Sequence, residues 1–195
     1  MARHKEFDVD AALDKAMTLF WRQGYERTSL DKLLKHMEIG RASFYNAFGD
    51  KHALFMRVLQ RYQQQYNQVV IIDTLQHAAS GLEGIQAVFE KVIDFLSSDS
   101  GQKGCMIVNS LIEIAPDDET VAAYVSEITQ CGEDAFYDAL RQAQQGGEIS
   151  QEIDCRAMAR FLMATIRGMR VTGRTTHDKR IFEDIATVAL STLKN

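Results

Sequence analysis

The side chains with the clearest capacity for chemistry lie in one short segment, residues 41–48. Phe44 and Phe48 are four residues apart and would share one face of a helix. The opposite face would carry Arg41, Ala42, Ser43, Tyr45 and Asn46. Arginine can donate two hydrogen bonds to a guanine edge, asparagine can pair with adenine, and alanine can touch a thymine methyl group. The hydroxyls and the nearby Lys51 can bind phosphate oxygens, so this segment predicts contact with double-stranded DNA.

A second short helix must precede this segment if the pattern is a helix-turn-helix. Residues 28–37 fit this role. Their apolar positions at helical spacing are Leu30, Leu33, Leu34 and Met37. Thr28 and Asp31 are typical of a capping box, in which a hydroxyl and a carboxylate bind open amides at a helix start. Gly40 is expected to supply the backbone freedom of the turn, and Thr28 and Ser29 complete the predicted DNA-contacting residues.

The segment resembles the DNA-binding motif of the TetR family of bacterial transcription regulators. Residues 39–51, Ile-Gly-Arg-Ala-Ser-Phe-Tyr-Asn-Ala-Phe-Gly-Asp-Lys, carry the resemblance, together with residues 20–25, Phe-Trp-Arg-Gln-Gly-Tyr, which close a preceding amphipathic helix. Two positions depart from the family pattern. Gly40 stands where the family often has serine, which removes a capping hydroxyl, and Ala47 replaces a commoner aromatic residue or histidine. The specific resemblance covers about the first quarter of the chain, and the remainder is similar in length and helical layout.

Charge is distributed unevenly along the 195 residues. The net charge is −5, but residues 1–61 hold eleven lysines and arginines against eight acidic residues, a local net charge of +3. A basic end that coincides with the motif fits phosphate binding, whereas the overall charge alone would not. We find neither a signal peptide nor an apolar run long enough for a membrane helix. The sequence therefore predicts a cytoplasmic protein without a membrane partner.

Hydrophobic spacing stays helical from residue 51 to the end of the chain, which predicts an all-α fold. A long connecting helix is expected at residues 51–72. Further helices are expected at 81–97, 104–115, 117–146, 154–174 and 178–194. We divide the chain into a three-helix helix-turn-helix DNA-binding head, residues 1–51, and a larger helical effector-binding and dimerisation body, residues 52–195.

The last predicted helix carries two apolar stripes. The first consists of Ile181, Ile185, Val188 and Thr192, and the second of Phe182, Ala186, Ala189, Leu190 and Leu193. One core cannot cover both stripes, so one should face a second copy of the chain, unless the helix lies deep within a monomer. The preceding helix would add Met158, Phe161, Leu162, Thr165 and Met169 to that interface. The TetR resemblance implies a homodimer joined by its last two helices, with two recognition helices about 34 to 36 Å apart on a near-palindromic operator.

The TetR resemblance further implies a repressor that a small effector releases from its operator. Binding in the body would shift the connecting helix and move the two heads out of register. Aromatic, apolar and polar side chains that could line an effector pocket are Tyr62, Tyr66, Phe89, Cys105, Met106, Asn109, Glu113, Tyr124, Phe136, Phe161 and Arg167. Each of them, taken singly, is also compatible with an ordinary place in the core.

Cys105 follows Gly104 at the start of a predicted helix, where the helix dipole favours a thiolate. Some TetR-family repressors that respond to electrophiles or oxidants resemble this arrangement. The alternative is a cysteine that only packs. A third possibility for regulation is a protein partner that binds the body in place of any small molecule.

Other chemistries lack support in the sequence. The three cysteines, Cys105, Cys131 and Cys155, are widely spaced without nearby histidines. Glu113, Glu127, Glu133 and Asp134 have the spacing of solvated helix faces. We therefore expect neither a metal nor another cofactor. Glycine-rich phosphate loops and nucleophile motifs are also missing from the sequence, so it does not predict an enzyme.

Overall fold

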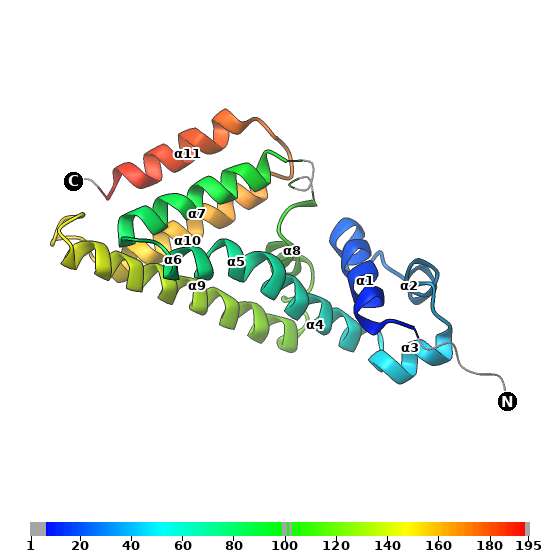
Figure 1. Ribbon diagram of the computed structural model, residues 1–195. Helices are drawn as coiled ribbons and strands as arrows, with labels where there is room; N and C mark the ends of the chain where they lie inside the picture. The colour runs from blue at the N-terminus through cyan, green and yellow to red at the C-terminus, as the bar shows by residue number, and fades with distance from the viewer. Residues whose placement is uncertain (1–6, 99–100, 102, 194–195) are drawn as a thin grey trace.

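The computed structural model describes residues 7–98, 101 and 103–193, and every regular element in these residues is a helix. The head consists of α1 (Val9–Gln23), α2 (Leu30–Met37) and α3 (Arg41–Phe48), and α4 (Lys51–Tyr62) leads from it into the body (Figure 1). The predicted all-α fold with an amino-terminal helix-turn-helix is confirmed. In the described part of the chain, none of the helices combines the length and apolar character needed to cross a bilayer.

The connection between head and body is not the single regular helix predicted for residues 51–72. After α4 the chain forms one π-helical turn, η1 (Gln63–Asn67), followed by α5 (Gln68–Val70) and α6 (Ile72–Gln76). The N–H of Gln68 donates to the carbonyl oxygen of Gln63, five residues back, where an α-helix would use the fourth residue back. The helical path therefore ends one turn later than predicted and contains a locally widened turn.

Within the described residues, five further α-helices form the body, and their ends lie within three residues of the predictions. They are α7 (Gly81–Leu96), α8 (Met106–Glu113), α9 (Glu119–Gln145), α10 (Cys155–Thr172) and α11 (Lys179–Ser191). Residue 194, the predicted end of the last helix, lies outside the described residues. The side chains of Ser80, Asp118, Asp154 and Asp178 accept hydrogen bonds from first-turn amides, which explains why four of these helices begin where they do. The helices α7, α9, α10 and α11 pack together away from the head (Figure 1).

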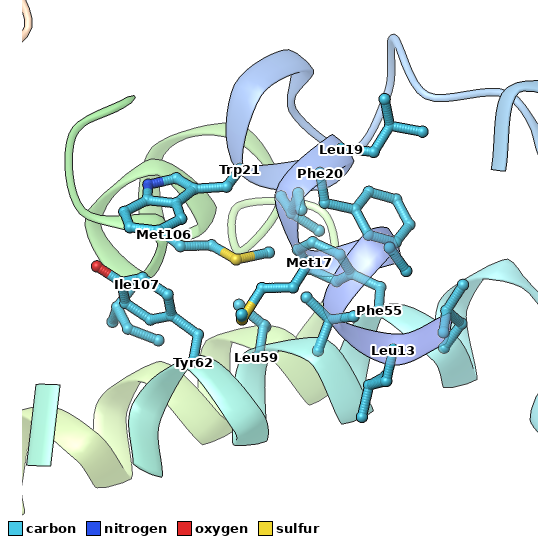
Figure 2. Packing of buried hydrophobic residues seen from close by; sticks show 14 of the residues in the cluster. Leu13, Met17, Leu19, Phe20, Trp21, Phe55, Leu59, Tyr62, Met106 and Ile107 are labelled. Atoms are coloured by element: carbon cyan, nitrogen blue, oxygen red, sulfur yellow. The ribbon is translucent and has the colours of Figure 1, made fainter. Parts of the chain in front are cut away.

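Two clusters of buried apolar side chains fill the molecule. The body cluster lies among α7, α9, α10 and α11 and includes Phe89, Phe136 and Phe182. The second cluster joins the head to α4, α8 and the first half of α9. Figure 2 shows side chains of α1, α4 and α8 meeting in this second cluster, among them Trp21 and Tyr62. The division proposed between residues 51 and 52 thus crosses a continuous apolar core.

Candidate nucleic-acid interface

The turn between α2 and α3 lies where it was predicted, but a different residue adopts the unusual backbone conformation. Glu38 has a φ of 59°, in the left-handed region, whereas Gly40 is extended with a φ of −75°. The N–H of Glu38 donates to the carbonyl oxygen of Leu34 and closes α2, while the Glu38 carboxylate pairs with Lys15 of α1. The prediction that Gly40 supplies the freedom of the turn is therefore wrong.

The start of α2 also differs from the prediction, because Ser29 and not Thr28 caps the helix. The Ser29 hydroxyl accepts a hydrogen bond from the N–H of Lys32 at 3.3 Å. Thr28 is fully buried, and its hydroxyl donates to the carbonyl oxygen of Gly24 at 2.6 Å. An enclosed hydroxyl of this kind cannot reach a phosphate, so the prediction of Thr28 as a DNA contact is corrected. Ser29 is exposed and remains a candidate.

The outer face of α3 carries the side chains predicted to meet DNA. Arg41, Ala42, Tyr45 and Asn46 are exposed, and Ser43 is half-buried. Phe44 and Phe48 are buried and hold the opposite face against the core, as predicted. The Arg41 guanidinium lies 2.6 Å from the exposed carboxylate of Asp31. Because an exposed ion pair contributes little net stability, Arg41 can exchange this partner for a base or a phosphate.

The end of α3 and the start of α4 are held by cations that lie over aromatic rings. Arg57 donates to the carbonyl oxygen of Ala47 at 3.0 Å, and its guanidinium lies 4.9 Å from the Phe48 ring centroid. The Lys51 ammonium, predicted to bind phosphate, lies 4.0 Å from the Tyr25 ring centroid and is half-buried. Desolvation by burial lowers the pKa of Lys51, against the opposing effect of nearby carboxylates. Lys51 thus positions the start of α4 against the loop that precedes α2.

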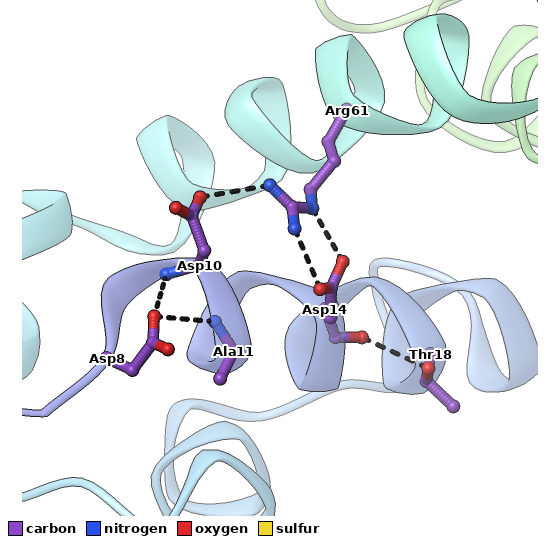
Figure 3. A network of polar contacts seen from close by, with 6 residues as sticks. All are labelled: Asp8, Asp10, Ala11, Asp14, Thr18 and Arg61. Carbon is purple, nitrogen blue, oxygen red and sulfur yellow. Dashed lines mark hydrogen bonds and ion pairs between the residues drawn. The ribbon is translucent and has the colours of Figure 1, made fainter.

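An ion-pair network fixes α1 against α4 (Figure 3). The Arg61 guanidinium donates to both carboxylate oxygens of Asp14, at 2.5 and 2.7 Å, and to Asp10 at 3.0 Å. The hydrogen bonds from Arg61 hold the pKa of Asp14 below its ordinary value. Two parallel bonds define an orientation as well as a distance. This network therefore helps to fix the orientation of the head, which contains α3, relative to α4.

Glu113, at the end of α8, joins the body to the head. Its carboxylate oxygens accept hydrogen bonds from the backbone N–H groups of Tyr25 at 3.2 Å and Glu26 at 3.0 Å, in the loop between α1 and α2. Sequence analysis placed Glu113 both in an effector pocket and on a solvated acidic face. The partners are more than 80 residues away in the chain, so no local pattern could have indicated this contact.

Sequence models of two protein families match this chain. Residues 12–58 match the bacterial regulatory proteins of the tetR family, and residues 81–189 match the tetracyclin repressor-like C-terminal domain. The chain belongs to the TetR family. It is a helix-turn-helix transcriptional regulator, and the exposed face of α3 lies within the first matched region.

Individual transcription regulators match over 88% to 99% of this chain. The uncharacterized HTH-type transcriptional regulator YezE of Bacillus subtilis is 34% identical over 99% of this chain and 100% of its own length. The HTH-type transcriptional repressor ComR of Escherichia coli is 32% identical over 88% of this chain and 82% of its own. The TetR-family regulator CifR was solved as a cysteine mutant with a 26-bp operator DNA. It is 29% identical to this chain and superimposes with a TM-score of 0.86, and the match covers 97% of this chain and 98% of the CifR chain.

The residues predicted for the effector pocket of this TetR-family protein do not line one cavity. Tyr62 and Tyr66 line one hollow, Arg167 borders a second, and Asn109 and Glu113 border a third. Buried core positions are occupied by Phe89, Cys105, Met106 and Phe136. Tyr124 is half-buried against the core shared with the head, and Phe161 is 43% exposed on the surface. The first hollow also contains Arg170, which sequence analysis did not select.

The residues predicted for the dimer interface divide into an exposed and a buried group. Phe161 of α10 and Ile181 and Val188 of α11 are 43%, 38% and 67% exposed. Met158, Thr165, Ile185 and Thr192 are half-buried. Leu162 and Met169 have no exposed surface, because they face the body core of their own chain, so their assignment to an interface is wrong. The second stripe of α11 packs inward, which leaves the first stripe open.

Replacing Gly40 by serine should strengthen DNA binding. The site has room, since nothing lies within 4 Å of a Cβ added at Gly40, and its extended backbone is accessible to any residue. A serine there can cap α3, which now lacks a side-chain cap, and can reach a phosphate. We expect operator binding to tighten by about 0.5 to 1 kcal/mol per head in a DNA titration. Gly40→Ala supplies the control, and equal affinities of the serine and alanine variants would show that the hydroxyl contributes nothing.

Proposed function

We propose that this TetR-family protein is a homodimeric repressor that binds a near-palindromic operator and leaves it when a small effector binds the body. The observation that carries the proposal is that one chain exposes both the polar face of α3 and the apolar stripe of α11. The first surface fits a DNA groove, and the second fits another copy of the chain. A dimer would present two such recognition helices to successive major grooves.

The relatives support the assignment of repression. CifR was solved together with operator DNA, and ComR is named a transcriptional repressor. Side chains suited to base edges lie exposed on α3 here, with Phe44 and Phe48 buried beneath them. We infer that Arg41 and Asn46 read base edges and that Ser29, Ser43 and Tyr45 bind the phosphate backbone.

Release by an effector is supported by contacts that run from the body to the head. The hollow at Tyr62 and Tyr66 lies beside the π-helical turn of the connecting segment. The first residue of α8 lies next to the buried phenol of Tyr62. Its last residue is Glu113, whose carboxylate accepts hydrogen bonds from the loop before α2. An effector that prefers the conformation unable to bind DNA by ~1 to 3 kcal/mol would lower operator affinity about 5- to 150-fold.

Modification of Cys105 is a second candidate for the release signal. Cys105 precedes the first residue of α8, and Arg170 donates a hydrogen bond to its sulfur at 3.2 Å. Against this, the residue is only 1% exposed, so a reagent must enter the core to reach it. With an electron-poor alkene the sulfur would form the new C–S bond and the thiol proton would pass to the adjacent carbon.

The test is selection of genomic DNA fragments with the purified protein, followed by titration of the selected sequence. A short near-palindrome bound by two copies of the chain is the expected result, and binding without sequence preference would contradict the proposal. Repeating the titration with N-ethylmaleimide, for the native protein and for Cys105→Ser, separates the two release signals. If the native protein leaves the operator and the Cys105→Ser variant stays bound, the release signal is assigned to Cys105. If both proteins stay bound, reversible binding of a ligand is the remaining release signal.

A further inference from the structure

A cleft of about 360 Å³ lies between the head and the body. Its walls come from the last turn of α1 and the loop that follows, from α8, and from the end of α10. It is the hollow bordered by Asn109 and Glu113, and one side is open to solvent. Its volume lies within the range of small-molecule sites, and a molecule bound there would contact both parts of the chain.

Arginine side chains dominate the charge of this cleft. Arg22 and Arg27 of the head border it together with Arg174, which follows α10. As far as the structure describes the chain, the lining holds one carboxylate, that of Glu113. Three positive charges and one negative charge give the lining a net charge of +2, although the whole chain carries −5. Like charges that converge in a cleft produce a potential that attracts anions.

Two glycines leave space for the charged side chains at this cleft. A Cβ at Gly104 would lie 2.6 Å from Cδ of Arg174, and a Cβ at Gly24 would lie 2.7 Å from both carboxylate oxygens of Glu113. The Arg174 guanidinium donates to the carbonyl oxygen of Lys103 at 2.8 Å. The Glu113 carboxylate accepts from two backbone N–H groups of the head loop. The contacts therefore hold Arg174 at the cleft and direct the Glu113 carboxylate to the head.

The lining favours one class of anion. A guanidinium presents a planar fork of donors that matches the oxygens of a phosphate group. A phosphate monoester carries a charge of about −1.5 to −2 at pH 7, which is close in magnitude to the charge of the lining, whereas a carboxylate carries a single charge. Ile112 and Val171 also border the cleft and are 66% and 47% exposed. Their apolar surface suits an ester with an apolar group and would stay uncovered by inorganic phosphate.

We propose that this cleft binds a small phosphate monoester with an apolar group, with the three arginines around the phosphate and Ile112 and Val171 against the apolar group. The assignment rests on the proposed function in one respect, since it identifies this ligand class with the effector. A phosphate that pairs with Arg22 and Arg27 of the head and with Arg174 of the body ties the two parts together. A head held in this way can no longer adjust to the half-site spacing of an operator.

Binding can be followed without DNA through Trp21, the only tryptophan of the chain, which borders the cleft. Phenyl phosphate, inorganic phosphate and phenol are titrated against the free protein at neutral pH, with fluorescence and calorimetry as the two readouts. We expect phenyl phosphate to bind at least about tenfold more tightly than phenol, because the arginines bind its charge, and about threefold or more tightly than inorganic phosphate. No binding of phenyl phosphate, or equal binding of phenyl phosphate and phenol, would overturn the proposal. Equal binding of phenyl phosphate and inorganic phosphate would overturn the choice of an ester.

Matched variants locate the site. Ile112→Glu and Ile112→Gln have nearly the same shape, and the exposed position accepts both. The added carboxylate should weaken phenyl phosphate binding about fivefold or more relative to the Gln variant. Arg174→Gln should weaken it about tenfold or more, whereas Arg141→Gln removes the same charge from an exposed position on α9 outside the lining and should have no effect. Equal affinities of the two Ile112 variants, or equal losses in Arg174→Gln and Arg141→Gln, would overturn the location of the site.

Operator DNA is a second source of phosphate groups, and the titrations separate it from a free ester. If the cleft served the DNA backbone instead, Arg22→Gln and Arg174→Gln would weaken operator binding while phenyl phosphate failed to bind the free protein, and the proposal would be overturned. Phenyl phosphate is then added to the complex with the selected operator. Binding in the cleft without release of DNA would overturn the identification with the effector and leave the phosphate site in place. Binding of phenyl phosphate by a protein that selects no operator would contradict the proposed function and leave the site in place.

Discussion

Tyr45→Ala should weaken operator binding by about 2 to 4 kcal/mol per dimer, a loss of roughly 30- to 700-fold. Tyr45 is 48% exposed on the outer face of α3, so its hydroxyl and ring are available to the DNA backbone. The effect should be large because a dimer loses the contact in both heads. Titration of the selected operator at fixed salt measures it, since phosphate contacts depend strongly on ionic strength.

Two controls separate a lost DNA contact from a damaged head. The thermal unfolding midpoint of Tyr45→Ala should remain close to that of the native protein, because the side chain is not part of the buried cluster and alanine is a good helix former. Tyr45→Phe keeps the ring and removes only the hydroxyl, so its loss of affinity reports the hydrogen bond alone. Unchanged affinity of Tyr45→Ala would refute the place of α3 in the DNA interface.

Val188→Asp should convert the protein to a monomer and reduce operator affinity by more than about 100-fold. Val188 is 67% exposed on α11, so an aspartate there is solvated in a single chain. In a dimer formed through this stripe, two carboxylates would be buried against apolar side chains without partners, which is strongly unfavourable. Once the two heads are no longer linked, each must bind its half-site separately.

Sedimentation analysis measures the oligomeric state, and Thr187→Asp is the matched control. Thr187 is the preceding residue of α11, is exposed, and belongs to neither apolar stripe. The same charge should therefore leave the dimer and its DNA affinity unchanged. A Val188→Asp protein that remains dimeric would place the interface on another surface of the body.

Local sequence patterns were sufficient to predict the helices and the exposed polar face of α3. Helix starts follow from side chains that cap them, and the inward face of α3 follows from the spacing of Phe44 and Phe48. These features depend on residues within one or two helical turns. The exposed apolar stripe on α11 could be predicted for the same reason. The prediction for α10 was wrong at Leu162 and Met169, because their inward direction depends on packing against α7 and α9.

The features that the sequence did not indicate depend on contacts between residues far apart in the chain. The π-helical turn has the composition of an ordinary polar helix, and its Asn67 meets Arg170 from a helix that lies a hundred residues later. Glu113 similarly finds its backbone partners in the head. Contacts between distant residues produce no periodic pattern in the sequence. The prediction of the eleven pocket residues therefore depended on side-chain type alone, and the structure places them in three different hollows, in the core and on the surface. Glu38 is a further case, since the backbone of the turn follows from the closing of α2 and not from the presence of Gly40.

The apolar cluster that joins the head to α4 and α8 limits how this protein can be re-engineered. Trp21 of α1 donates to the carbonyl oxygen of Gly104 at 2.8 Å, and its ring packs against Tyr62. A chimera cut after residue 51 would separate both contacts and expose the apolar surface on each fragment. New DNA specificity is therefore better introduced by exchanging the outer residues of α3. Such a variant keeps the native contacts between the head and the body.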